Sequence, residues 1–236
     1  MLIPDRIDTD ELLDKTDVDL REAAESFDDL HTINRFLGGA GVYKKTLFRI
    51  LRTYPRTRHL SILDVGAGSG DMSADILKRC RSHINSVTLT GLDVQHKFLR
   101  LVRQRQAPVN NIDLVASDAM TMPFIDNSFD VVISNLVLHH FYDTADELLC
   151  EMYRVARHAV VVNDILRHRM PLLFFKIFSP LFVDSPITQY DGEVSLRRAF
   201  SFAEIRRLLH GTDYTDYYFV KHWSFRFGLV IWKKRW

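Results

Sequence analysis

From residue 59 to residue 164, continuous apolar runs alternate with segments that have the apolar spacing of helices. The apolar runs are HLSILDVG, VTLTGLDV, IDLVASD, FDVVISN and HAVVVND, and the helical spacing falls at about 70–82, 95–106 and 143–157. Strands that are buried on both faces have continuous Val, Ile and Leu runs, and helical crossovers join them in parallel. The alternation therefore predicts an α/β fold, with helices on both faces of a mostly parallel sheet.

The flanking segments complete this predicted domain. Residues 20–37 and 42–54 have helical apolar spacing and predict two lead-in helices. After the last apolar run, an aromatic-rich insertion at about 165–200 precedes the helical stretch SFAEIRRLLH. The strand-like runs DYTDYYFV and SFRFGLVIW then have only KHW between them, which predicts an antiparallel hairpin at the sheet edge. We expect residues 1–58 to pack as a helical segment on one domain formed by residues 59–236.

Composition is that of an ordinary globular chain. Of its 236 residues, 47% are hydrophobic and 26% are charged, without a repeat of solenoid length. Cys80 and Cys150 lack the CxxC spacing of zinc or redox sites, and the acidic N-terminus does not resemble an export signal. The longest apolar stretch, residues 170–183, is too short to span a bilayer. We therefore expect a cytoplasmic monomer or homodimer without a metal or a transmembrane segment.

Charge is distributed unevenly along the chain. Residues 1–29 carry eleven Asp and Glu against three Lys and Arg, which leaves the rest at +9 although the whole chain is +1. A basic body can attract an anionic partner such as RNA. No basic run, however, is interleaved with the aromatic residues that a base-stacking surface needs. We therefore expect solvated arginines and no nucleic-acid partner.

A glycine-rich turn directly follows the first predicted strand, in ILDVGAGSGD. Gly66, Gly68 and Gly70 would let a ligand approach the backbone and the free N–H groups of the next helix. The spacing is GxGxG, whereas a dinucleotide fingerprint has its third glycine at the position that Asp71 occupies. Because an acidic side chain is also a poor neighbour for pyrophosphate, a nicotinamide dehydrogenase is the least favoured function.

Three aspartates, Asp64, Asp93 and Asp118, stand at the carboxyl ends of predicted strands. Asp93 closes the second strand, where a carboxylate can accept hydrogen bonds from both hydroxyls of a ribose. Asp118 follows the third strand, where it could bind an adenine amino group. The residues expected to flank the adenine ring are Val94, Ala119 and Met120. One such aspartate alone is more often a cap or turn residue, but three at the ligand-binding edge of a sheet predict a nucleoside site.

Taken together and in order, ILDVGAGSGD, GLDV, SDAMTMPF and FDVVISNLVLHHF resemble the cofactor motifs of class I S-adenosylmethionine-dependent methyltransferases. The chain is similar to the group with ubiquinone and menaquinone methyltransferases, over roughly residues 59–164. The resemblance implies a Rossmann-like seven-stranded sheet with an antiparallel last strand, and S-adenosylmethionine as the cofactor. It assigns Asp64 and the turn at 66–70, with Ala67, to the methionine moiety. It also assigns Asp93 to the ribose, Asp118 to the adenine and Asn135 to the surroundings of the sulfonium.

Methyl transfer needs mainly alignment of nucleophile, methyl and sulfur in a dry cleft, because the positive sulfur already activates the methyl group. A phenol acceptor, with a free pKa of about 10, would gain from a positioned base. His139 and His140 follow the fourth strand and are the predicted catalytic residues, although such a pair can also shape the pocket without moving a proton. The following NLVL lacks the Asn/Asp-Pro-Pro-aromatic element typical of methyltransferases that act on planar amino groups.

The apolar insertion lies where related methyltransferases place a substrate lid. We expect residues 170–190 to roof a pocket for an aromatic or lipid-like acceptor, with plain core or a dimer or membrane-surface contact as alternatives. Arg197 and Arg198 are expected to form surface salt bridges, or else to bind an acidic substrate group. The predicted function is methyl transfer to a small hydrophobic or phenolic, quinone-like metabolite, at oxygen, with carbon as the alternative acceptor atom. Alternatives are an RNA or protein methyltransferase and a non-catalytic cofactor-binding partner subunit.

Overall fold

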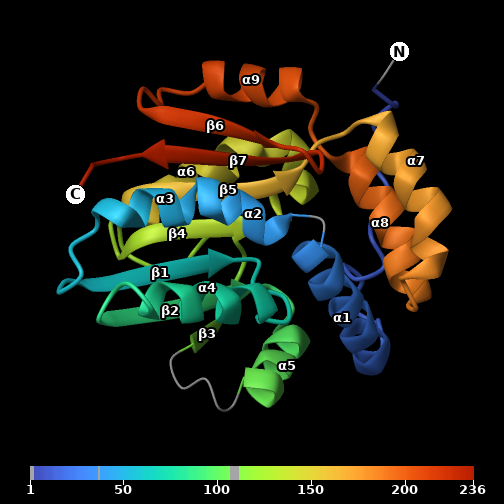
Figure 1. Ribbon diagram of the computed structural model, residues 1–236, viewed down its shortest axis with the longest axis horizontal. Helices are drawn as coiled ribbons and strands as arrows, with labels where there is room; N and C mark the ends of the chain where they lie inside the picture. Colours follow the sequence, from blue (N-terminus) through green and yellow to red (C-terminus); the bar gives the residue numbers. More distant parts are fainter. Residues whose placement is uncertain (1–2, 37, 107–111) are drawn as a thin grey trace.

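The computed structural model describes residues 3–36, 38–106 and 112–236, and a seven-stranded sheet lies at its centre (Figure 1). The strands are β1 (His59–Val65), β2 (Ser86–Asp93), β3 (Ile112–Ala116), β4 (Phe129–Asn135), β5 (Ala156–Ile165), β6 (Tyr217–His222) and β7 (Arg226–Trp232). Their order is β3-β2-β1-β4-β5-β7-β6. Strands β1 to β5 pair in parallel, and β7 is antiparallel to β5 and to β6. The predicted Rossmann-like sheet with an antiparallel last strand is confirmed.

The last two strands form the expected hairpin, with β7 on its inner side. Strand β7 inserts between β5 and β6, so β6 forms the edge of the sheet. Every residue of β7 is buried, whereas β6 is mostly half-buried. This arrangement explains why SFRFGLVIW is the more apolar of the two runs.

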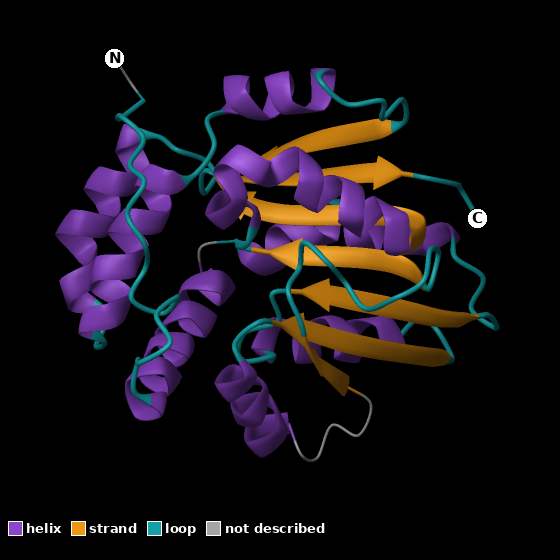
Figure 2. Cartoon of the chain, turned by 180° about the vertical axis from the view of Figure 1, so that it is seen from behind, coloured by secondary structure: helices purple, strands orange, loops and turns teal. Residues whose placement is uncertain are grey.

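Helices cover both faces of the sheet (Figures 1 and 2), and alternate residues of the central strands face two separate cores. Leu60 and Ile62 of β1 pack with the helices α2, α3 and α4, and Leu63 and Val65 pack on the opposite face with α6 and α9. The bounds are α2 (Gly39–Lys45), α3 (Leu47–Ile50), α4 (Asp71–Arg81), α6 (Ala145–Val155) and α9 (Phe202–His210). Helix α5 (His96–Gln106) contacts β2 and β3. Burial on both faces thus accounts for the continuous apolar runs.

The second lead-in helix differs from its prediction. The stretch 42–54 is not one helix, because α2 ends at Lys45, Thr46 has non-helical angles, and α3 is followed by the 3-10 turn η1 (Leu51–Thr53). The break lies where α2 approaches β7 closely, since a Cβ on Gly228 would lie 2.7 Å from Cγ1 of Val42. Residue 37, included in the first predicted helix, lies outside the described residues.

Three helices lie beyond the carboxyl ends of the parallel strands, where Figure 1 shows them side by side. They are α1 (Leu20–Phe36), α7 (Arg169–Phe178) and α8 (Pro186–Arg198), with the 3-10 turn η3 (Ser179–Leu181) after α7. Phe175 of α7 and Leu196 of α8 share a small core with Ile33 of α1. The division into 1–58 and 59–236 stays a prediction, because α1 packs with the insertion and α2 packs on the sheet.

Candidate functional site

A cavity of about 830 Å³ opens at the carboxyl ends of the central strands, between the sheet and the helices α1, α7 and α8. The predicted site residues that line it are Gly66, Ala67, Gly68, Asp93, Val94, Asp118, Ala119, Asn135, His139 and His140. Asp64, Gly70 and Met120 were also predicted but do not line the cavity. Residues from separate parts of the chain therefore meet in one pocket of ordinary ligand-binding size.

The glycine turn has a backbone conformation that favours glycine. Gly66, Gly68 and Gly70 have φ angles of 73°, 52° and 75°, in the left-handed region. The backbone N–H of Gly66 donates to the carbonyl of Leu92 at 2.8 Å, so β2 holds the start of the turn. Helix α4 begins directly afterwards, at Asp71. The turn thus leaves N–H groups of the backbone and of the helix start close to the cavity, where they can donate hydrogen bonds to a ligand.

Asp93 fastens the turn to the end of β2. Its Oδ2 accepts the backbone N–H of Gly68 at 2.8 Å, and its Oδ1 accepts that of Gln95 at 2.8 Å. Burial raises the pKa of this carboxyl group, which is 8% exposed, and the two backbone donors oppose that shift. Since a carboxylate can accept about four hydrogen bonds, capacity remains for two ligand hydroxyls.

Asp118 and Val94 line the cavity just beyond the ends of the parallel strands β3 and β2. The Oδ1 of Asp118 accepts the backbone N–H of Met120 at 2.8 Å, so Asp118 is also a turn residue. Among the described residues, its Oδ2 has no protein partner. Val94 is 69% exposed although it lines the cavity. An exposed apolar side chain beside a free carboxylate oxygen suits a flat ligand with a polar edge.

Asp64 lies beneath the turn and is 2% exposed. Its Oδ2 accepts a short hydrogen bond from the Ser73 hydroxyl, and its Oδ1 has no partner among the described residues. Burial raises the pKa of Asp64 to about 7, and the charge of Asp93 adds to that increase. Asp64 therefore supports the turn from below and exchanges a proton near neutral pH.

We expect Asp64→Asn to change how stability depends on pH. The folded pKa lies above the ordinary value of 3.8, so the folded chain holds an extra proton between about pH 4 and pH 7. As the pH rises through this window, the free energy of unfolding of the wild type should therefore fall relative to that of Asp64→Asn. Each unit of pKa difference contributes about 1.4 kcal/mol, so the total is a few kcal/mol. Urea unfolding of both proteins at several pH values measures the difference. Parallel profiles would contradict this account of Asp64.

The turn after β4 directs two histidines into the cavity. Leu136 has a φ of 59°, which is unusual for a residue other than glycine, and its N–H donates to the carbonyl of Asn163 at 2.9 Å. A 3-10 segment (Leu138–Thr144) follows, and the rings of His139 and His140 lie 4.2 Å apart between centroids. Strained backbone of this kind is typical of functional sites.

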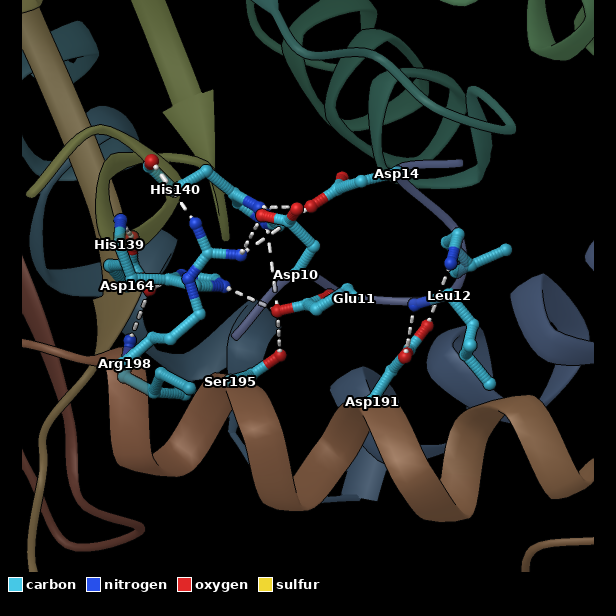
Figure 3. A network of polar contacts seen from close by, with 12 residues as sticks. Asp10, Glu11, Leu12, Asp14, His139, His140, Asp164, Asp191, Ser195 and Arg198 are labelled. Carbon is cyan, nitrogen blue, oxygen red and sulfur yellow. Dashed lines mark hydrogen bonds and ion pairs between the residues drawn. The ribbon is translucent and has the colours of Figure 1, made fainter. Parts of the chain in front are cut away.

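The two histidines form a polar cluster with Glu11 of the N-terminal segment (Figure 3). The Oε1 of Glu11 lies 3.3 Å from Nε2 of His139 and 3.8 Å from Nε2 of His140. Each imidazole is held through Nδ1, His139 by Asp164 at 2.8 Å and His140 by Asp14 at 3.0 Å. We refer to Glu11, His139 and His140 as the Glu-His-His cluster.

Charge in this cluster depends on its burial and on its carboxylates. Burial alone would lower the pKa of His139, but Asp164 and Glu11 raise it to about 10. Burial opposes the shift of Glu11 as well, yet its contacts with His139, His140 and Ser195 lower its pKa. Without a ligand, the cluster therefore holds a positive charge between two carboxylates.

The sequence did not reveal that the N-terminal segment contributes to the site. Asp191 of α8 accepts the backbone N–H groups of Leu12 at 2.6 Å and Leu13 at 3.0 Å, and Ser195 donates to Oε1 of Glu11 at 2.5 Å. The acidic composition of residues 1–29 was the only signal of this contact. Such contacts join positions about 180 residues apart, and they leave no periodic pattern in a sequence.

Arg198 corrects one expectation. It was predicted to form surface salt bridges, but it is 6% exposed and lines the cavity. Its guanidinium lies 3.6 Å from a carboxylate oxygen of Asp14 and donates to the carbonyl of His140 at 3.4 Å. The last turn of α8 is buried against the N-terminal segment, and that burial changes the environment of Arg198.

Residues 63–162 match the family described as the methyltransferase domain. The demethylmenaquinone methyltransferase of Staphylococcus epidermidis is 34% identical over 128 residues, which cover 51% of this chain and 52% of that protein. The demethylmenaquinone methyltransferase of Listeria monocytogenes is 28% identical over 210 residues, which cover 76% of this chain and 84% of that protein. The chain thus spans about half the length of the staphylococcal relatives it matches.

A solved structure shows the same fold. The plantazolicin methyltransferase BpumL, in complex with a pentazolic desmethyl analog and SAH, aligns with a TM-score of 0.68 at 17% identity, and the alignment covers 93% of each chain. This likeness concerns the fold, and the family assignment rests on the matched domain and the relatives. Residues 63–162 form a methyltransferase domain of the class I S-adenosylmethionine-dependent type.

Proposed function

We propose that this chain transfers a methyl group from S-adenosylmethionine to a small hydrophobic, phenol- or quinol-like metabolite. The observation that carries the proposal is one continuous cavity, which joins the glycine turn and Asp93 to an apolar wall and a histidine pair. The names of the relatives, demethylmenaquinone methyltransferases, support an acceptor with an aromatic ring. When bound, S-adenosylmethionine supplies a methyl group that is already activated by positive sulfur.

The residues of the glycine turn fit this cofactor. Asp93 has acceptor capacity left for the two ribose hydroxyls, and the Oδ2 of Asp118, to which no described residue donates, remains for the adenine amino group. The turn at 66–70 and the carboxylate of Asp64 beneath it would hold the methionine moiety. The residues proposed to flank the adenine and the sulfonium are Val94, Ala119, Met120 and Asn135. Of these, Met120 does not line the cavity and would act through its backbone turn with Asp118.

The apolar wall of the cavity would hold the acceptor and exclude water. Leu30 and Ile33 of α1 and Met170 and Phe174 of α7 all line the cavity. A water-poor surrounding strengthens the alignment of nucleophile and methyl group on which this reaction depends. We therefore assign α7 the role of the predicted lid over the acceptor.

The histidine pair would lie at the acceptor's hydroxyl. His140 lines the cavity, its side chain is 22% exposed, and Asp14 orients its ring. Removal of the hydroxyl proton there makes the acceptor oxygen a better nucleophile. It also raises the electron density at the neighbouring ring carbons. Oxygen is the acceptor atom that we propose, and carbon is the alternative with the same requirement for a proton acceptor.

A labelled transfer assay tests the function directly. The full chain is incubated with S-adenosylmethionine labelled in the methyl group and with pools of phenols and quinols. We expect label in an organic-extractable product and formation of S-adenosylhomocysteine in equal amount. Binding of S-adenosylhomocysteine in a calorimeter, without transfer to any acceptor of this class, would instead support the non-catalytic partner subunit.

Two adjacent phenylalanines of α7 provide a matched test of the lid. Both line the cavity, but Phe174 is 45% exposed, whereas Phe175 is 7% exposed and packs against Gly192. Phe174→Ala should raise the acceptor KM about 5- to 10-fold, on the order of 1 kcal/mol, and leave the Kd of S-adenosylhomocysteine unchanged. Phe175→Ala should instead lower stability by about 3–5 kcal/mol. Loss of cofactor affinity in Phe174→Ala would contradict the lid assignment.

Location and assembly remain part of the proposal. Among the helices of residues 3–36, 38–106 and 112–236, none is both long and apolar enough to cross a membrane. Cys80 and Cys150 are free thiols, which supports the expected cytoplasmic location. A monomer or homodimer stays the expected state, and size-exclusion chromatography with light scattering distinguishes the two.

A further inference from the structure

We infer that the Glu-His-His cluster is a binding site for a divalent transition-metal ion such as Zn²⁺ or Co²⁺. Two imidazole nitrogens and one carboxylate oxygen, from His139, His140 and Glu11, lie within 4.8 Å of one another. Two histidines with one carboxylate form a common ligand set for such ions, which leaves further positions open. The site goes beyond the methyl transfer proposed above, since it stands on these residues alone.

The spacing of the three atoms fits an ion between them. Two ligands of a tetrahedral ion with bonds of about 2.0–2.1 Å lie about 3.3–3.4 Å apart. The Oε1 of Glu11 is 3.3 Å from Nε2 of His139 and 3.8 Å from Nε2 of His140. The lone pairs of metal ligands point at the ion and not at one another. Ligand atoms should therefore not form good hydrogen bonds with each other. Among the described residues, the buried Nε2 of His139 indeed makes no hydrogen bond of acceptable geometry.

The surroundings of the cluster are those of a metal site. Histidine ligands usually donate their other ring N–H to a carboxylate, which fixes the ring for the ion. Both histidines have this partner on Nδ1, Asp164 for His139 at 2.8 Å and Asp14 for His140 at 3.0 Å. The hydroxyl of Ser195 donates to Oε1 of Glu11, the proposed ligand atom, at 2.5 Å and so holds this oxygen in place. Two independent carboxylates that orient two neighbouring rings toward one point are more than a surface ion pair requires.

The charge balance also favours a cation. Glu11 belongs to the cluster, and Asp14 and Asp164 contact its histidines. Within the described part of the chain, Arg198 is the one residue whose guanidinium contacts these groups. With neutral imidazoles, which metal binding requires, this arrangement leaves two uncompensated negative charges. Burial of uncompensated charge is costly, and a divalent ion neutralises both.

The position of the site suggests its use, and this step rests on the proposed function. The cluster lines the same cavity as the glycine turn and the apolar wall. An ion held there could take the acceptor oxygen as a further ligand and favour loss of its proton to solvent. His140 would then act through the ion instead of accepting the proton itself.

Metal binding is tested on the full chain without a histidine tag, after treatment with a chelator and in the absence of S-adenosylmethionine and acceptor. We expect one Zn²⁺ or Co²⁺ per chain in equilibrium dialysis, and visible absorption bands for bound Co²⁺. His139→Gln and His140→Gln should each lower the affinity on the order of 100-fold or more. Asp164→Asn, which keeps all three ligands, should lower it about 10- to 100-fold.

His83→Gln is the matched control, because this exposed histidine follows α4 at the other end of the sheet, and it should bind the ion as the wild type does. His140 is partly exposed, so His140→Gln remains informative even if His139→Gln does not fold. No bound ion in the wild type, or equal binding by the wild type and His140→Gln, would overturn the inference. If metal-free protein still transfers the methyl group, the proposed function stands, and the ion has no part in the reaction. If the protein binds the ion but transfers no methyl group to any acceptor of this class, the metal site stands and the proposed function fails.

Discussion

Asp93→Ala is expected to lower the affinity for S-adenosylmethionine and S-adenosylhomocysteine at least about 100-fold while the chain stays folded. Two ribose hydroxyls that donate to this carboxylate contribute about 1.5–3 kcal/mol each. The variant also removes the acceptor that fixes the N–H of Gly68, so the glycine turn loses its anchor to β2. Calorimetric titration with S-adenosylhomocysteine measures the change.

Asp113→Asn is the control for this result, because Asp113 is an exposed aspartate on the neighbouring strand β3. It should titrate like the wild type. If Asp93→Ala bound the cofactor product as tightly as this control, the assignment of Asp93 to the ribose would be wrong.

Asp191→Ala is expected to release the N-terminal segment from the site. Its carboxylate accepts the N–H groups of Leu12 and Leu13, two charge-assisted bonds worth about 1.5–3 kcal/mol each. Their loss should speed hydrogen exchange at these two amides by about 100-fold or more, because local opening then costs less free energy. Exchange measured by mass spectrometry on the N-terminal peptide reports this change, and turnover should fall with it because Glu11 leaves the cavity.

Glu193→Gln on the same helix removes a different charge, one that pairs with Lys176 instead of the N-terminal segment. Its exchange pattern at Leu12 and Leu13 should match the wild type. Unchanged exchange in Asp191→Ala would mean that other contacts hold the segment.

The sheet and the cofactor edge were predictable because their signals are local in the sequence. Each parallel strand is buried on both faces and therefore appears as an apolar run, and each ligand-facing residue of this edge directly follows such a run. Asp93 and the glycine turn at 66–70 could thus be placed at one edge of the sheet, and their cofactor roles stay a prediction from the family resemblance. The antiparallel pairing of β6 with β7 was also accessible, because the short connector KHW favours a hairpin.

The acceptor side of the cavity could not be predicted in the same way. Asp191 binds Leu12, and Glu11 contacts His139, across more than a hundred residues, and no periodicity links such positions. Arg198 was misjudged because a charged residue in a helix is exposed by default, and only the folded N-terminal segment buries it. The sequence therefore predicted the position of a residue where one strand and its following loop determine it.

The place of β7 in the sheet has a consequence for biosynthesis. During translation, β5 emerges long before its neighbour, and its open edge can pair with another nascent chain until residues 226–232 leave the ribosome. That edge belongs to AVVVN, a run of high β-propensity without charge. Premature termination within the last hairpin should therefore produce aggregates rather than a slightly shortened protein.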